Sequence, residues 1–191
     1  MSRSKYGKLI VASNITIAGS GYAGTVDVPA GDGGGVIGAQ HVEVTWTRAD
    51  PDPLAATGGT TYYGTGGFWT ALITPGAPCD PQTVTLDLAK GQNGTPASVL
   101  EIFGGARTYR FVVAAQGKTV TFNCGGVPAP TLIGHDITVG VCESDQSGTG
   151  AGAVPYTDIN KLASSGPAPA GTGAPSACPP NTTATWSFTP H

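Results

Sequence analysis

RTYRFVVAAQGKTVTFNC, residues 107–124, alternates apolar and polar side chains over most of its length and decides the class of fold. The apolar positions lie two residues apart: Tyr109, Phe111, Val113, Val120, Phe122 and Cys124. Because successive side chains of a β-strand point to opposite faces, this period predicts strands with one buried and one solvated face. Gln116-Gly117, between the two halves, favours a tight two-residue hairpin.

The same alternation recurs along the rest of the chain. We expect about ten strands, which cover residues 8–17, 22–28, 41–47, 60–63, 68–74, 82–88, 97–103, 107–115, 118–124, 131–141 and 183–188. Asn93-Gly94 is a strong turn signal and predicts a second hairpin, between 82–88 and 97–103. Helix signals are nearly absent, because 30 Gly and 16 Pro interrupt almost every stretch. The pattern predicts an all-β fold, an antiparallel β-sandwich of the jelly-roll or Ig-like type.

The 191 residues are expected to form a single β domain over 1–191. Within it, residues 1–20 are a candidate N-terminal arm. Residues 144–180 are rich in Gly, Pro and Ser and resemble a linker in composition, but the strand at 183–188 follows them. We therefore interpret 144–180 as a long surface excursion, in which only 156–163 could make a helical turn or two.

The charge balance excludes some classes of partner. Nine Lys and Arg against twelve Asp and Glu give a net charge of −3, and the basic residues form no run. Phosphate binding normally needs a basic patch, so we expect no nucleic-acid partner. The longest apolar runs, at 9–12 and 111–115, fall far short of the roughly 18 residues that predict a membrane span. The apolar start is interrupted at Ser13 and Asn14, so we expect no signal peptide either.

Four cysteines, Cys79, Cys124, Cys142 and Cys178, are present, and no C-x-x-C pair supports a zinc site. They can form two disulfides in three connectivities, or they can stay reduced and buried, and the sequence leaves both readings open. Disulfides indicate an oxidising location, although no export signal is visible. A virion protein satisfies both conditions, since it is made in the host cytoplasm without a signal peptide and reaches the oxidising exterior at lysis.

Residues that could carry catalysis are few. His41, His135 and His191 are the only histidines, and no nucleophile-elbow motif accompanies them. A hydrolase would require His41 or His135 to lie beside a nucleophile. We expect instead that these two histidines lie on solvated strands and that the protein has no catalytic residues.

Metal and cofactor motifs are equally weak. Asp50, Asp52, Glu143 and Asp145 lie in expected loops and could offer oxygen ligands to Ca²⁺. The EF-hand spacing is absent, and acidic turn residues are common without a metal. The glycine-rich segment 29–38 is not followed by a helix, as a phosphate-binding loop requires. We therefore predict no bound metal and no cofactor.

GGTTYYGTGGFWTAL, residues 58–72, places aromatic side chains on both sides of a glycine-rich tetrapeptide. If 64–67 is a hairpin loop, Tyr62 and Trp69 form a cross-strand pair that enters the core. The outward set would then be Tyr63, Phe68 and Leu72. Such an apolar patch can bind a partner, or the 144–180 excursion or a loop can cover it within one subunit, and both readings stay open.

The sequence thus predicts a non-enzymatic structural or decoration subunit of a larger assembly, with a bacteriophage or other viral particle as that assembly. Its partners would be proteins, including further copies, packed against the outward set, the edge strands and the arms at 1–20 and 144–180. The alternative is a secreted carbohydrate-binding or adhesive β-sandwich module, with a glycan as the partner. Thr and Gly surround the aromatic residues in the sequence, which favours protein packing over sugar binding.

Overall fold

The computed structural model describes residues 20–30, 36–89, 97–133, 137–140, 153–167, 170–172 and 183–191. The first six strands are β1 Gly21–Val28, β2 Ile37–Arg48, β3 Gly59–Ile73, β4 Gln82–Asp87, β5 Val99–Phe103 and β6 Thr108–Ala114. The others are β7 Lys118–Cys124, β8 Val127–Ile133, β9 Ile137–Gly140, β10 Val154–Pro155, β11 Leu162–Pro167, β12 Ala170–Thr172 and β13 Thr183–Pro190. Within the described residues the one helical element is a 3-10 turn, η1 Ala55–Thr57. The all-β prediction is confirmed.

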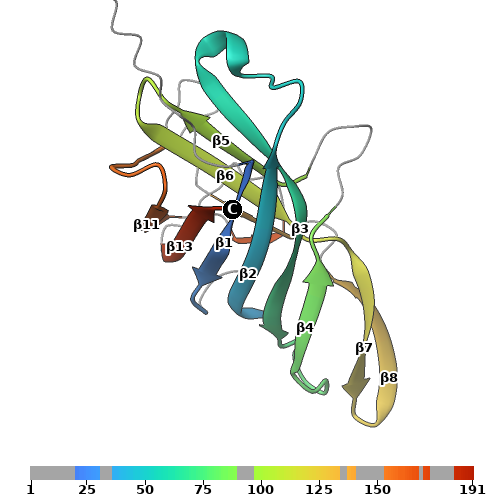
Figure 1. The fold of residues 1–191 in the computed structure, drawn as a ribbon. Helices are drawn as coiled ribbons and strands as arrows, with labels where there is room; N and C mark the ends of the chain where they lie inside the picture. Colours follow the sequence, from blue (N-terminus) through green and yellow to red (C-terminus); the bar gives the residue numbers. More distant parts are fainter. Residues whose placement is uncertain are drawn as a thin grey trace, which may run out of the picture.

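One strongly curled antiparallel sheet forms the body of the molecule (Figure 1). Its strand order is β11-β13-β1-β2-β3-β5-β6-β9-β12, with β4 also paired to β3 and β10 to β6. The curl brings β6 over β2 and β13, so that the ring of Phe111 lies 6.4 Å from Trp46, 5.3 Å from Trp186 and 4.9 Å from Phe188, centroid to centroid. The body is therefore a half-barrel, and the expected sandwich of two separate sheets is not confirmed.

The stretch 58–72 does not contain the predicted hairpin. Residues 59–73 form one strand, β3, in which Gly64, Gly66 and Gly67 pair with β2 instead of forming a turn. A Cβ on Gly67 would approach the Glu43 carbonyl oxygen to 2.0 Å, so the absence of a side chain permits this close pairing. Thr65 is an extra residue at a β-bulge, and it reverses which face each later side chain takes. Tyr62 and Trp69 are consequently both buried, as predicted, although they do not pair.

The predicted partners of the central strands are also wrong. β4 and β5 do not form a hairpin, because both pair with β3, β4 along Phe68–Ile73 and β5 along Gly59–Tyr63. β6 pairs with β5, and β7 pairs with β8 instead of β6. The β7–β8 turn is Gly125-Gly126, with φ of 63° and 87°, as in a type I′ hairpin. Two glycines adopt this turn without strain, which Gln116-Gly117 could not do as readily.

The described part of 144–180 belongs to the main sheet. It contributes β10, β11 and β12, and Leu162 of β11 is fully buried. Residues 156–163 form a turn and the start of β11 rather than a helical turn. The predicted strand 131–141 is divided between β8 and β9. The predicted strand at 8–17, residues 1–19 of the predicted arm at 1–20 and the Asn93-Gly94 turn lie outside the described residues.

The core fills the inside of the curl. Its largest fully buried side chains are Trp46, Trp69, Tyr22, Tyr62, Tyr109, Phe122 and Phe188. Two buried hydrogen bonds satisfy indole N–H groups: Trp186 Nε1 donates to Tyr109 Oη at 2.7 Å, and Trp69 Nε1 donates to Gln40 Oε1 at 2.9 Å. In the part of the chain that the structure describes, no helix is long and apolar enough to cross a membrane.

Candidate binding surface

Five neighbouring strands each place one side chain in a single row across the outer face of the main sheet. From β13 to β4, this outer row is Thr185, Asp27, His41, Thr70 and Thr85. Every member lies between two buried residues of its own strand, so the row points away from the core. Neighbouring strands lie about 4.8 Å apart, and four such intervals give the row a length of about 19 Å.

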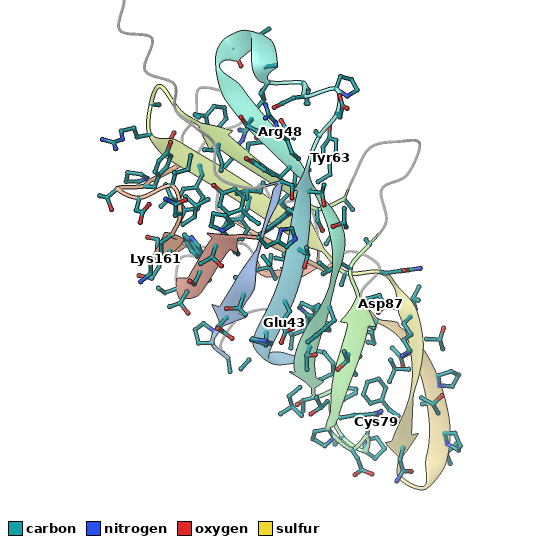
Figure 2. The ribbon with its side chains drawn as sticks, viewed as in Figure 1. Glu43, Arg48, Tyr63, Cys79, Asp87 and Lys161 are labelled. Carbon is teal, nitrogen blue, oxygen red and sulfur yellow. A yellow bond between two sulfur atoms is a disulfide. The ribbon has the colours of Figure 1, made fainter. Side chains whose placement is uncertain are left out.

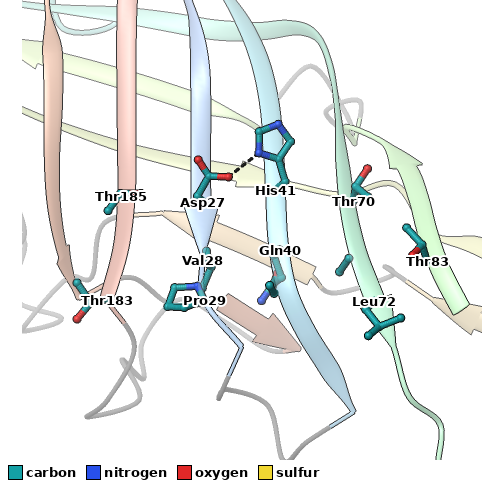
Figure 3. Close-up of a pocket in the computed structure, with 12 residues that line it drawn as sticks. Asp27, Val28, Pro29, Gln40, His41, Thr70, Leu72, Thr83, Thr183 and Thr185 are labelled. Atoms are coloured by element: carbon teal, nitrogen blue, oxygen red, sulfur yellow. Dashed lines mark hydrogen bonds and ion pairs between the residues drawn. The ribbon is translucent and has the colours of Figure 1, made fainter. Parts of the chain in front are cut away.

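An open groove of about 530 Å³ runs along the outer row (Figure 3). Four row members line this outer groove, together with Pro29, Ala39, Leu72, Thr83 and Thr183. A register shift in β2 between Ile37 and Gln40 marks a bulge at this end of the sheet. The bulge lets both Ile37 and Gln40 turn toward the core, which leaves the small side chain of Ala39 on the outside.

His41 is held between two carboxylates at the centre of the outer row. Its Nδ1 lies 2.6 Å from Asp27 Oδ1, and its Nε2 lies 3.6 Å from Glu43 Oε1 (Figure 3). The hydrogen bond with Asp27 is the largest of the effects that raise the pKa of His41 above its ordinary value. In a Ser-His-Asp triad the second ring nitrogen would face a nucleophile, whereas here it faces Glu43. The geometry therefore resembles a charge cluster and not a triad.

The predicted outward set of β3 does not form one patch. Tyr63 and Phe68 are half-buried and lie five positions apart on the same strand, on opposite sides of the bulge. Leu72 is 46% exposed and lines the outer groove. Phe68 lies between Glu43 of β2 and Asp87 of β4, so its neighbours include carboxylates, contrary to the expectation of Thr and Gly alone.

The hairpin of β7 and β8, which we call the ribbon, extends beside β4 at one end of the molecule (Figure 1). One face of β7 packs inward through Val120 and Phe122. β8 is largely exposed, and Val127 and Leu132 have 64% and 57% of their surface accessible. These are the two most exposed large apolar side chains of the described residues.

Two prolines protect the edge of β8 that no other described strand pairs with. A two-residue hairpin makes Cys124 and Val127 a hydrogen-bonded pair, and alternation then directs the backbone of residues 128, 130 and 132 away from β7. Pro128 and Pro130 have no N–H, so this edge lacks two of the donors that an added strand would need. The ribbon is thus suited to contacts through its side chains, and not to pairing with a strand of another chain.

A disulfide joins Cys79, which precedes β4, to Cys124 at the end of β7 (Figure 2). The Asp80 N–H also donates to the Asn123 carbonyl oxygen at 2.9 Å, so the tip of the ribbon is tied to the start of β4. A cross-link across 45 residues stabilises a fold by about 4 kcal/mol in the chain-entropy model. Cys142 and Cys178 lie outside the described residues.

The acidic loop at Asp50 and Asp52 has a structural role. Asp52 Oδ1 accepts hydrogen bonds from the N–H groups of Leu54 and Thr61, at 3.0 and 3.1 Å, and so fixes the turn around η1. Its Oδ2 lies 3.8 Å from Arg48. No group of three or more metal-ligating side chains gathers among the described residues.

The other candidate residues from the sequence lie away from the outer row or outside the described residues. Glu143, Asp145 and His135 belong to segments that the structure does not describe. His191 is exposed at the end of the chain, where its N–H donates to the Gly21 carbonyl oxygen.

Sequence reasoning missed the outer row and the ribbon for different reasons. The row depends on the register of five strands, which no local pattern specifies. The ribbon did carry a signal, because Pro at alternate positions in VPAPTLI, residues 127–133, indicates an edge strand, and its other residues are mostly apolar.

No protein-family model, curated protein or solved structure matches this chain at a significant level. The assignment of a function therefore depends on the geometry of the outer face and the ribbon.

Proposed function

We propose that this chain is a non-enzymatic structural subunit that packs against neighbouring subunits of a larger assembly through the ribbon. The assembly that we propose is a viral particle, such as that of a bacteriophage, in which the chain is a coat or decoration component. We further propose that the two opposed halves of the curled sheet correspond to the layers of a jelly-roll or Ig-like sandwich.

The exposed apolar surface of β8 is the observation that carries the proposal. Pro128, Pro130 and Leu132 lie on one face of β8 and are all exposed, and Val127, on the opposite face, is exposed at the tip. Exposed apolar surface of this kind is typical of protein interfaces. The disulfide at the tip of the ribbon supports a location outside a reducing cytoplasm, which a released particle provides.

Light scattering over a range of protein concentrations tests the simplest case, an assembly of identical chains. We expect an oligomer that dissociates in the variant Val127→Ser/Leu132→Ser, because the variant replaces the two most exposed large apolar side chains of the ribbon. Leu72→Ser is the matched control, since it removes a similarly exposed aliphatic side chain from the outer groove. A monomer at every concentration, or dissociation by Leu72→Ser alone, would contradict the proposal.

A second candidate function is a carbohydrate-binding or adhesive module. It is favoured by the position of Phe68 between Glu43 and Asp87, because sugar sites combine an aromatic ring with hydrogen-bonding groups beside it. This candidate uses the outer face and not the ribbon, so the two functions can be tested separately.

A further inference from the structure

We propose that the outer groove is a binding site for an uncharged oligosaccharide that lies across β13, β1, β2, β3 and β4. This inference rests on the second candidate function and is independent of assembly through the ribbon.

The dimensions of the site fit an extended ligand. The outer row spans about 19 Å across the strands, so it could contact several units of a linear ligand rather than one. The groove volume of about 530 Å³ lies within the range of small-molecule sites, roughly 300 to 1,000 Å³. The groove is open to solvent, which allows a chain to enter from the side.

The groups of the outer row match a ligand that carries several hydroxyls. Thr hydroxyls both donate and accept hydrogen bonds, the Asp27 carboxylate accepts, and the His41 ring can do either. Thr70 and Thr85 already share a hydrogen bond of 3.0 Å, which orients their hydroxyls on the exposed face. Asp27 and His41 orient one another in the same way, and their side chains are 57% and 40% exposed. The row therefore presents fixed hydrogen-bonding groups on strands, where little entropy is lost on binding.

The groove also offers apolar surface for the C–H faces of a sugar ring. Leu72 lines one side of the groove together with Thr70 and Thr83, and Phe68 lies beyond the groove lining, one outward position further along β3. A sugar ring has C–H groups on its faces and hydroxyls on its rim, so it needs apolar and polar contacts side by side. The outer face offers this alternation, which a purely apolar protein partner would not use.

The charges on this face select against acidic ligands. Asp27, Glu43 and Asp87 all lie on this face, on β1, β2 and β4, and His41 is the basic group between Asp27 and Glu43. Within the five strands that form the site, Arg48 at the far end of β2 is the sole Lys or Arg. Sulfated or uronate-rich glycans would be repelled by this net negative face, so the ligand should be uncharged.

The test is a printed array of neutral hexose and N-acetylhexosamine oligosaccharides, with uronate and sulfated oligosaccharides as the acidic set. We expect the wild-type protein to bind at least one neutral oligosaccharide and none of the acidic set.

The bound oligosaccharide is then titrated in solution against variants whose circular dichroism matches that of the wild type. Asp27→Ala should weaken binding about tenfold, because it removes a charged acceptor. Phe68→Ala should weaken it as well.

Tyr63→Ala is the matched control, because Tyr63 is a half-buried outer-face aromatic of the same strand at a distance from the groove. It should bind like the wild type. The inference is overturned if no neutral oligosaccharide binds, if acidic ones bind as well, or if Asp27→Ala and Phe68→Ala leave the affinity unchanged. Val127→Ser/Leu132→Ser should keep the glycan affinity while losing the oligomer, so failure of one proposal does not entail failure of the other.

Discussion

His41 shows how one residue depends on the strands on both sides of it. Asp27 of β1 and Glu43 of its own strand favour the protonated imidazole, and the pKa of His41 is raised above the ordinary value of 6.5. Because the folded-state pKa is the higher one, the pairing stabilises the fold fully below pH 6.5. This contribution is lost as the pH rises through the raised pKa. The effect is modest, since both partners are exposed and solvent screens the pair.

Replacing the partner should lower the pKa of His41. In Asp27→Asn the imidazolium loses its closest negative charge, so the pKa is expected to fall toward 6.5. An NMR titration of the imidazole resonances measures the change directly. Asp80→Asn, beside the tip of the ribbon, is the control and should leave the pKa of His41 unchanged. Identical titration curves for Asp27→Asn and the wild type would show that the contact with Asp27 does not form in solution.

At the scale of elements, the irregular positions of the strands determine the faces they present. The Thr65 bulge moves Tyr62 and Trp69 to the same side of β3, and the bulge in β2 does the same for Ile37 and Gln40. Period-two reasoning assigns faces correctly only between such positions. It placed Tyr62 and Trp69 in the core because the predicted four-residue loop also reversed the alternation. The burial of Tyr62 and Trp69 was therefore predicted correctly from a hairpin that does not form.

The edge of β8 offers a prediction at this scale. Pro128→Thr/Pro130→Thr restores two outward N–H groups, and should allow β8 to pair with a strand of another molecule. The change is made in the Val127→Ser/Leu132→Ser background, so that association through the apolar side chains is already removed. We expect concentration-dependent association with an intermolecular β signal in the infrared spectrum.

Thr121→Val in the same background is the control for the edge. It adds apolar surface to β7 of the ribbon without adding a backbone donor, so it should stay dissociated. If the proline double variant also stays dissociated, the prolines do not limit strand pairing.

At the scale of the whole molecule, the sequence predicted the strands far better than their pairing. The alternation at 41–47, 82–88, 118–124 and 183–188 corresponds to β2, β4, β7 and β13. Strand pairing depends on contacts between residues distant in sequence, such as those of β5 with the first half of β3 and of β4 with its second half. The Asn-Gly and Gln-Gly turn signals are local, so they could not indicate these pairings. The curl likewise arises from the meeting of Phe111 with Trp186 and Phe188, which lie more than 70 residues away.

Site features that depend on alternation within one strand could be predicted from the sequence, and those that depend on strand pairing could not. Leu72 was predicted to face outward and is exposed, because this follows from alternation within one strand. The outer row could not be predicted, since Asp27 and His41 meet only through the register of β1 with β2. Among the possible disulfides, the one between Cys79 and Cys124 likewise requires β4 and β7 to lie side by side, which the sequence did not indicate.

The central claim is that the ribbon is the surface through which the subunit contacts its neighbours. The most direct measurement places a photo-reactive amino acid at position 132 of the assembled protein and, in a parallel sample, at position 72. The account predicts cross-links between chains from position 132 and few from position 72. Cross-links between chains from position 72 with none from position 132 would contradict it.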